Sequence, residues 1–189
     1  MKSKNYRIDR IKETFSSNYQ QFGRDNFYQS LPELKISGQR STEKRLKIYE
    51  LRKFINKKTS VLDIGSNCGF LSLTVSRLAK SVNGLEPNSS LTIISNDTKQ
   101  LLKIKNCKFI NKNFKDFHTN KRFDVILSFA VHFWVNLLFY NFIKKINKML
   151  KLDGYLILES HELKHLDKDF SLRIKVLENF GFRIIKKGL

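Results

Sequence analysis

The stretch Val61-Leu-Asp-Ile-Gly-Ser-Asn-Cys-Gly-Phe70 decides the fold of this chain. Residues 61–64 are a short apolar run of the kind that forms a buried parallel strand. Gly65 and Gly69 bracket a loop, and residues 70–80 have the periodicity of a helix. A strand, a glycine loop and a helix in this order form a nucleotide-type binding site, because glycines let the backbone approach a ligand and the helix start offers free N–H groups.

The spacing of the glycines differs from that of the dinucleotide-binding motif. Asn67 stands where the second glycine of Gly-x-Gly-x-x-Gly would be, so the pattern is Asp-x-Gly-x-x-x-Gly. Glu86 closes the next predicted strand, Val82-Asn-Gly-Leu-Glu86. On these residues the chain resembles the class I S-adenosylmethionine (SAM) methyltransferases, whose first motif is similar. The resemblance covers about residues 60–187.

Beyond this stretch, strands and helices alternate along the chain. We expect further strands at 108–111, 123–130, 155–159 and 182–186, and helices from Ser41 to about residue 56, from Ser89, over 136–150, and from Asp167 or Asp169 to a stop at Gly181. This alternation favours an α/β fold with a doubly wound, mostly parallel sheet. The resemblance implies a sheet of the class I methyltransferase type, which we expect to lack the closing C-terminal strand. We predict one domain over 1–189, with a helical cap (1–57) and a Rossmann-like core (58–189).

The resemblance also implies a set of cofactor-binding residues. Asp63, at the end of the first strand, is expected to orient the loop and the methionine moiety of SAM. Glu86 is expected to accept both ribose hydroxyls, as the acidic residue of dinucleotide-binding folds does. The other positions implied are Gly65, Ser66, Asn67 and Gly69 in the loop, Pro87 after Glu86, Asn113 and Phe114 at the adenine, and Ser128 at the end of the fourth strand.

One position departs from the family pattern, and two have alternatives. Asn67 replaces a residue that is frequently glycine, although Asn tolerates left-handed backbone angles better than most residues. Asn113 stands at the position of the usual acid, and Asp116 takes that role if the register is shifted. Arg40 precedes the core and either pairs with the SAM carboxylate or lies on the surface beside a helix start.

Two histidines are candidate catalytic bases. His132 follows the fourth predicted strand and His161 follows the fifth, so both lie at strand ends over the expected crevice. The alternative for each is a structural histidine that is bonded to the backbone. Trp134 is interpreted as part of an apolar acceptor wall or of the core. Glu159 is interpreted as a residue that orients His161 or binds an amine acceptor.

Composition limits the possible partners. The net charge is +19 and the pI is near 10.0, which indicates a polyanionic partner or the codon bias of an AT-rich genome. No apolar run is long enough to span a membrane and the N-terminus has no apolar signal region, so we expect a cytoplasmic protein. Two cysteines and scattered histidines give no zinc-ligand spacing, and we expect no metal.

Three functions follow from these observations. The first is SAM-dependent methyl transfer to a small-molecule, sugar or lipid-linked acceptor, which the short chain favours. The second is methylation of RNA, which the charge favours, together with a faint resemblance to the Bicoid-interacting RNA-phosphate methyltransferases in the Asp-Ile-Gly-x-Asn-x-Gly loop. The third is a non-catalytic SAM- or RNA-binding module. The sequence indicates neither the acceptor atom nor the oligomeric state.

Overall fold

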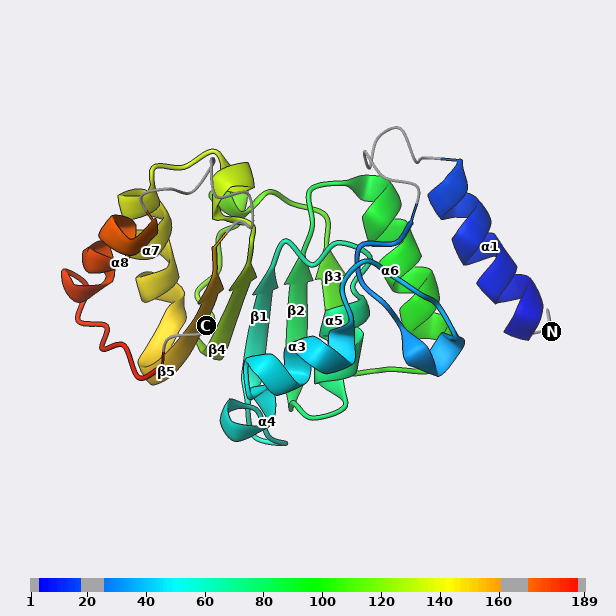
Figure 1. Cartoon of the computed structure of the whole chain (residues 1–189), viewed down its shortest axis with the longest axis horizontal. Helices are drawn as coiled ribbons and strands as arrows, with labels where there is room; N and C mark the ends of the chain where they lie inside the picture. Colours follow the sequence, from blue (N-terminus) through cyan, green and yellow to red (C-terminus); the bar gives the residue numbers. More distant parts are fainter. Residues whose placement is uncertain (1–3, 18–25, 161–169, 187–189) are drawn as a thin grey trace.

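A parallel sheet forms the centre of the molecule. The computed structural model describes residues 4–17, 26–160 and 170–186. Its strands are β1 (Ser60–Ile64), β2 (Ser81–Leu85), β3 (Cys107–Ile110), β4 (Phe123–Phe129) and β5 (Leu150–Glu159). Their order in the sheet is β3-β2-β1-β4-β5, and every pair is parallel. Figure 1 shows β1 in the middle, with β2 and β3 on one side and β4 and β5 on the other. The predicted α/β fold with a parallel sheet is confirmed.

Helices cover both faces of this sheet. The helical elements are α1 (Lys4–Ser16), η1 (Pro32–Leu34), α3 (Thr42–Ile48), α4 (Leu51–Phe54), α5 (Phe70–Ser76), α6 (Ser89–Leu101), η2 (Phe114–Asp116), η3 (His132–Val135), α7 (Phe139–Met149) and α8 (Phe170–Glu178). Alternate residues of each strand face opposite sides, so Val61 packs in one apolar cluster and Leu62 in another. The first cluster joins the sheet to α1, α3, α5 and α6, and the second joins it to α7 and α8.

The predicted helix from Ser41 to about residue 56 is two helices. Ser41 caps α3 as expected, because its Oγ accepts a hydrogen bond from the backbone N–H of Lys44 (3.2 Å). Glu50 then adopts a left-handed conformation (φ 48°), which interrupts the helical path before α4 begins. One residue separates the predicted and observed caps of α6, since Asn88 rather than Ser89 accepts from Leu91 N–H.

The C-terminal segment departs further from the prediction. Residues 182–186 form no strand, and within the described residues nothing pairs with the outer edge of β5. Lys186 instead forms an ion pair with Glu50 (2.8 Å), and Ile184 and Ile185 are exposed, whereas Phe182 packs on the second apolar cluster. The predicted helix start at Asp167 or Asp169 lies outside the described residues. The following helix is α8, and Gly181 donates to the carbonyl of Glu178 after its end.

The N-terminal segment is docked on the core by specific contacts. Gln29 is buried, and its Oε1 accepts a hydrogen bond from the backbone N–H of Leu71 in the first turn of α5 (3.0 Å). A Cβ at Gly38 would lie 2.3 Å from the backbone carbon of Gln29, so the chain passes too closely there for another residue. Helix α1 lies against α6 (Figure 1), where Arg10 pairs with Asp97 (3.0 Å). None of the helices described is both long and apolar enough to cross a lipid bilayer.

Candidate functional site

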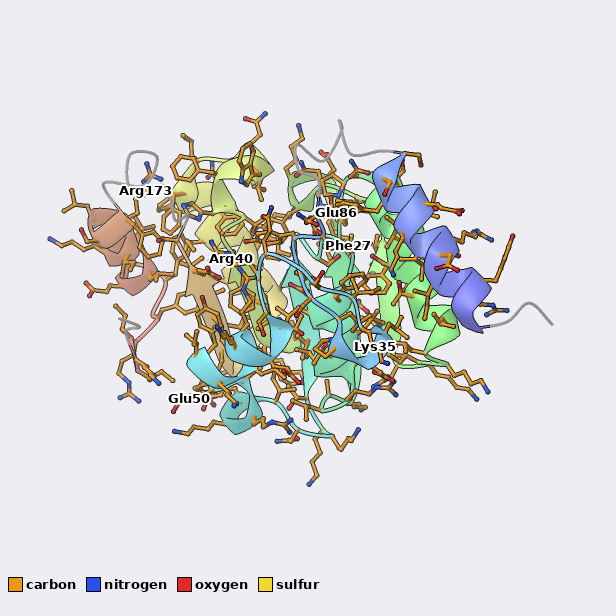
Figure 2. The ribbon with its side chains drawn as sticks, turned by 45° about the vertical axis from the view of Figure 1, so that its right-hand side comes forward. Phe27, Lys35, Arg40, Glu50, Glu86 and Arg173 are labelled. Carbon is orange, nitrogen blue, oxygen red and sulfur yellow. The ribbon has the colours of Figure 1, made fainter. Side chains whose placement is uncertain are left out.

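A pocket of about 520 Å³ opens at the carboxyl ends of the strands. The core contributes loops that follow β1, β2, β3, β4 and the end of β5, and the N-terminal segment contributes a further wall. This is where open parallel sheets bind ligands. Figure 2 labels Arg40 and Glu86, which line it from the N-terminal segment and from the core. The lining residues are Tyr28, Gln39, Arg40, Ile64, Gly65, Asn67, Leu85, Glu86, Pro87, Lys112, Asn113, Phe114, Phe129, Ala130, Val131, Trp134, Val135 and Glu159.

The loop after β1 has the backbone shape that the sequence predicts. Gly65 and Asn67 line the pocket, and both have positive φ values (74° and 54°). The backbone N–H groups of Gly65 and Ser66 donate to the carbonyl of Leu85 in β2, which fixes the loop against the neighbouring strand. A Cβ at Gly65 would lie 2.4 Å from Val131, so glycine is required there by the packing of the opposite wall as well as by the turn.

Gly69, which the resemblance implies is part of the cofactor loop, packs against the core in this structure. It is the residue before α5 and has φ 72°, but it does not line the pocket. A Cβ there would lie 2.4 Å from the Phe109 ring and 2.9 Å from Ser95 Oγ. Gly69 therefore permits close packing of the loop on β3 and α6, beneath the surface that faces the pocket.

Glu86 joins the loop to the end of β2. Its Oε2 accepts from the N–H of Asn67 (2.9 Å) and its Oε1 accepts from the N–H of Asn88 (3.0 Å). Burial raises the pKa of Glu86, and the two backbone donors counteract this rise. Each carboxylate oxygen has a second acceptor position, so Glu86 retains capacity for hydroxyl donors from a ligand in the pocket.

Asp63 lies beneath the loop and not on the pocket wall. Its carboxylate is buried and accepts a hydrogen bond from the hydroxyl of Ser72 in α5. Burial raises its pKa to about 6, although the Ser72 hydroxyl and the positive charge of Arg45 oppose this rise. Asp63 is therefore linked to α5 by the Ser72 hydrogen bond and to α3 by the charge of Arg45. Because Asp63 does not line the pocket, it can act on a ligand through the loop that lies above it.

Residues after β2 and β3 form one end of the pocket. Pro87, Lys112, Asn113 and Phe114 line it, as the sequence predicts for three of them. Asn113 caps η2 by accepting from Lys115 N–H (3.0 Å), which leaves its amide donors available. Asp116, the alternative to Asn113, is not among the lining residues.

At the other end of the pocket lies an ion pair between a buried arginine and a half-buried glutamate, which the sequence did not predict. Arg45 of α3 donates to Glu159 Oε2 (3.3 Å) and to the Tyr28 hydroxyl (3.1 Å). Its guanidinium also lies 5.4 Å from the centroid of the Phe129 ring, on which Tyr49 stacks (4.6 Å between centroids). The pKa of Tyr49 is raised by burial and by Glu159. Glu159 lines the pocket and is thus held in place from the N-terminal segment.

The histidine and serine candidates have less direct positions. His132 is buried, and its ring contacts Phe133, Phe139 and Phe170 rather than the pocket. Ser66 and Ser128 are also buried and are not among the lining residues. His161 and Glu162 lie outside the described residues. Among the residues that the structure does describe, no group of three or more His, Cys, Asp or Glu side chains could hold a metal ion.

Comparisons with known proteins agree with this geometry. The profile of the family described as "Methyltransferase domain" matches residues 55–180. An uncharacterised RNA methyltransferase of Mycoplasma mobile is 38% identical over 80 residues, which are 41% of this chain and 22% of that protein. The chain thus matches less than a quarter of the length of this relative.

Solved structures share the fold at low sequence identity. The precorrin-6y C5,15-methyltransferase of Geobacter metallireducens GS-15 has a TM-score of 0.59 at 18% identity, over 78% of this chain and 74% of that one. The N-methyltransferase NodS of Bradyrhizobium japonicum WM9 has a TM-score of 0.61 at 15% identity, over 72% and 80%. The family match, the sheet order and the loop after β1 lead to one conclusion: the chain belongs to the methyltransferase domain family and has the α/β fold of the class I SAM-dependent methyltransferases.

Proposed function

We propose that this chain transfers the methyl group of SAM to a nucleophile on RNA. The observation that carries the choice of acceptor is the net charge of +19, together with Lys112 in the lining of the pocket. A phosphate backbone is attracted by such a charge, and neutralising phosphates supplies much of the affinity of nucleic-acid binding. The name of the Mycoplasma mobile relative supports the same acceptor class.

The residues of the pocket fit the cofactor. Glu86 offers a carboxylate to ribose hydroxyls, and the backbone of Gly65 and Asn67 approaches the ligand without a bulky side chain between them. Asn113 offers amide donors to the adenine, and Arg40 suits the carboxylate of the methionine moiety. When bound, SAM supplies an electrophilic methyl group; the transfer releases S-adenosylhomocysteine (SAH), and a proton is lost where the nucleophile is a hydroxyl or amine.

The size of the pocket supports a large acceptor that inserts one group. Pockets of roughly 300–1,000 Å³ hold a single drug-sized ligand, and this pocket has about 520 Å³. SAM alone is a ligand of that size, so little volume remains for a second whole molecule. The protein's contribution to rate is then to hold the inserted nucleophile in line with the methyl group.

A small-molecule, sugar or lipid-linked acceptor is the second candidate, and one observation favours it. The end of the pocket with Tyr28 and Glu159 is walled by the N-terminal segment and contains a carboxylate held by Arg45. Such a site suits a polar compound with hydroxyl or amino groups. His132 and His161 stay predictions as bases for either acceptor, and Glu159 is the carboxylate that faces this end of the pocket.

The test separates the cofactor from the acceptor. We would measure SAM and SAH binding by calorimetry for the wild type and for Glu86→Ala, with Glu178→Ala on α8 as the matched control. We expect affinity to fall at least about tenfold in Glu86→Ala only, as for the loss of a charge-assisted hydrogen bond. Methyl transfer from labelled SAM into RNA, compared with a panel of sugars and amines, then identifies the acceptor class. Cofactor binding without transfer to either would instead support a non-catalytic module.

A further inference from the structure

We infer that Trp134 is the stacking surface for an unpaired base of single-stranded RNA at the mouth of the pocket. This inference deepens the RNA acceptor proposed above and rests on it. Trp134 is the single tryptophan of the chain, lies in the short helix η3 after β4, and lines the pocket while 68% exposed. A large aromatic side chain so exposed at a pocket mouth presents area that a ligand would cover.

Basic groups lie in the pocket lining, in its wall and beside the residue that precedes Trp134. Lys112 lines the pocket after β3, and Lys145 lies 5.3 Å from the centroid of the Phe114 ring in the wall. On the other side, the guanidinium of Arg173 lies 4.9 Å from the centroid of Phe133, the residue before Trp134. Figure 2 shows Arg173 on α8, with Arg40 between it and Glu86 in that view. An exposed aromatic side chain with cationic groups in the same region is the combination that binds a base and its neighbouring phosphates.

The chemistry favours an unpaired base over a duplex. Sequence-tolerant binding of single strands combines a basic groove with aromatic rings on which bases stack. An enzyme that modifies a nucleotide must bring it out of the helix, because the reacting atom cannot reach the pocket within a stack. Trp134 follows β4, whose end contributes Phe129 and Ala130 to the same pocket, so a base on the indole lies beside the reaction site.

The fluorescence of the wild-type protein measures this contact directly, since all tryptophan emission comes from Trp134. We would titrate the full chain, saturated with SAH, with a single-stranded RNA of about 12 nucleotides and with a duplex of the same length. We expect saturable quenching by the single strand. Its affinity should fall about tenfold or more between about 50 and 200 mM salt if three phosphates are neutralised.

Variants separate stacking from the overall charge. With fluorescein-labelled RNA, Trp134→Ala should weaken binding about fivefold to a hundredfold, as for the loss of one stacked base, and Trp134→Phe should retain most of the affinity. Tyr6→Ala is the matched control, because Tyr6 is an exposed aromatic residue on α1, distant from α7 in Figure 1. Lys112→Ala should reduce the salt dependence, whereas Lys58→Ala, before β1, should not.

The outcomes are distinct. Unchanged RNA affinity in Trp134→Ala, absence of quenching, or equal quenching by the duplex overturns the stacking surface. If wild-type protein nevertheless methylates RNA, the proposed function stands and only this inference fails. If the wild type binds SAH but neither binds nor methylates RNA, the RNA acceptor fails as well. A urea unfolding midpoint of Trp134→Ala equal to that of the wild type is the control for its fold.

Discussion

Replacing Gly69 by alanine tests whether the second glycine of the loop serves packing rather than ligand contact. A Cβ at this position meets the Phe109 ring at 2.4 Å and Ser95 Oγ at 2.9 Å, and the backbone is left-handed. The left-handed conformation costs an alanine about 1–2 kcal/mol. Overpacking against a buried ring costs about 1–3 kcal/mol. We expect Gly69→Ala to lower the free energy of unfolding by about 2–5 kcal/mol, measured by urea unfolding at unchanged m-value.

Two other glycines separate these contributions. Gly181 has a similar φ (77°) and no atom within 4 Å of a built Cβ, so Gly181→Ala measures the backbone cost alone. Gly84 has no positive φ but its Cβ would meet Phe109 at 2.8 Å, so Gly84→Ala measures the steric cost. Phe109→Leu in the Gly69→Ala background should restore part of the loss. Equal destabilisation by Gly69→Ala and Gly181→Ala, within about 0.5 kcal/mol, would refute the packing argument.

Further predictions concern buried polar groups. The pKa of Asp63 is about 6 in the folded state and near 3.9 in the unfolded state, so its contribution to stability is complete below about pH 4 and is lost as the pH rises towards 6. In urea titrations over that pH range, the wild type should lose up to about 3 kcal/mol of unfolding free energy relative to Asp63→Asn. Parallel pH profiles of the two proteins would contradict this. Glu159→Leu leaves the buried Arg45 without its main carboxylate and should cost about 3 kcal/mol, part of which Arg45→Met in the same chain recovers. Gln29→Ala leaves the first turn of α5 without an acceptor for Leu71 N–H and should cost about 1–3 kcal/mol in urea unfolding, and an unchanged stability would contradict this.

The features predicted correctly from the sequence are those encoded over a few consecutive residues. The strand, loop and helix at 61–76, the left-handed Asn67 and the position of Glu86 at the end of β2 all follow from local patterns. The cap of α6 was wrong by one residue, because Asn88 and Ser89 are both good caps and only the path of the chain decides between them. The start of β5 at Leu150 was missed, since its first residues are mostly exposed and lack the apolar run on which the prediction relied.

The contacts that the sequence did not reveal are those between distant segments. Arg45 and Glu159 are 114 positions apart, and nothing in the pattern around either residue identifies the other. The need for glycine at position 69 depends in the same way on a distant residue, because the ring of Phe109 in β3 lies where a Cβ would be. In the sequence, Arg45 is one of several polar positions in the predicted helix after Ser41. Only the burial of its guanidinium, seen in the folded structure, distinguishes it from a surface arginine.

The position of Arg45 bears on whether residues 1–57 form a separable cap. Its charge acts on two carboxylates, the half-buried Glu159 at the end of β5 and the buried Asp63 in β1, and these strands flank β4 in the sheet. A core that begins at residue 58 would retain both carboxylates but lose their shared cation, and burial of an uncompensated charge is costly. It would also uncover Phe70, which packs on Phe27 (5.3 Å between centroids). We therefore expect residues 58–189 expressed alone to fail to fold cooperatively in urea titrations, because the N-terminal segment completes the apolar cluster and balances the charge of the sheet.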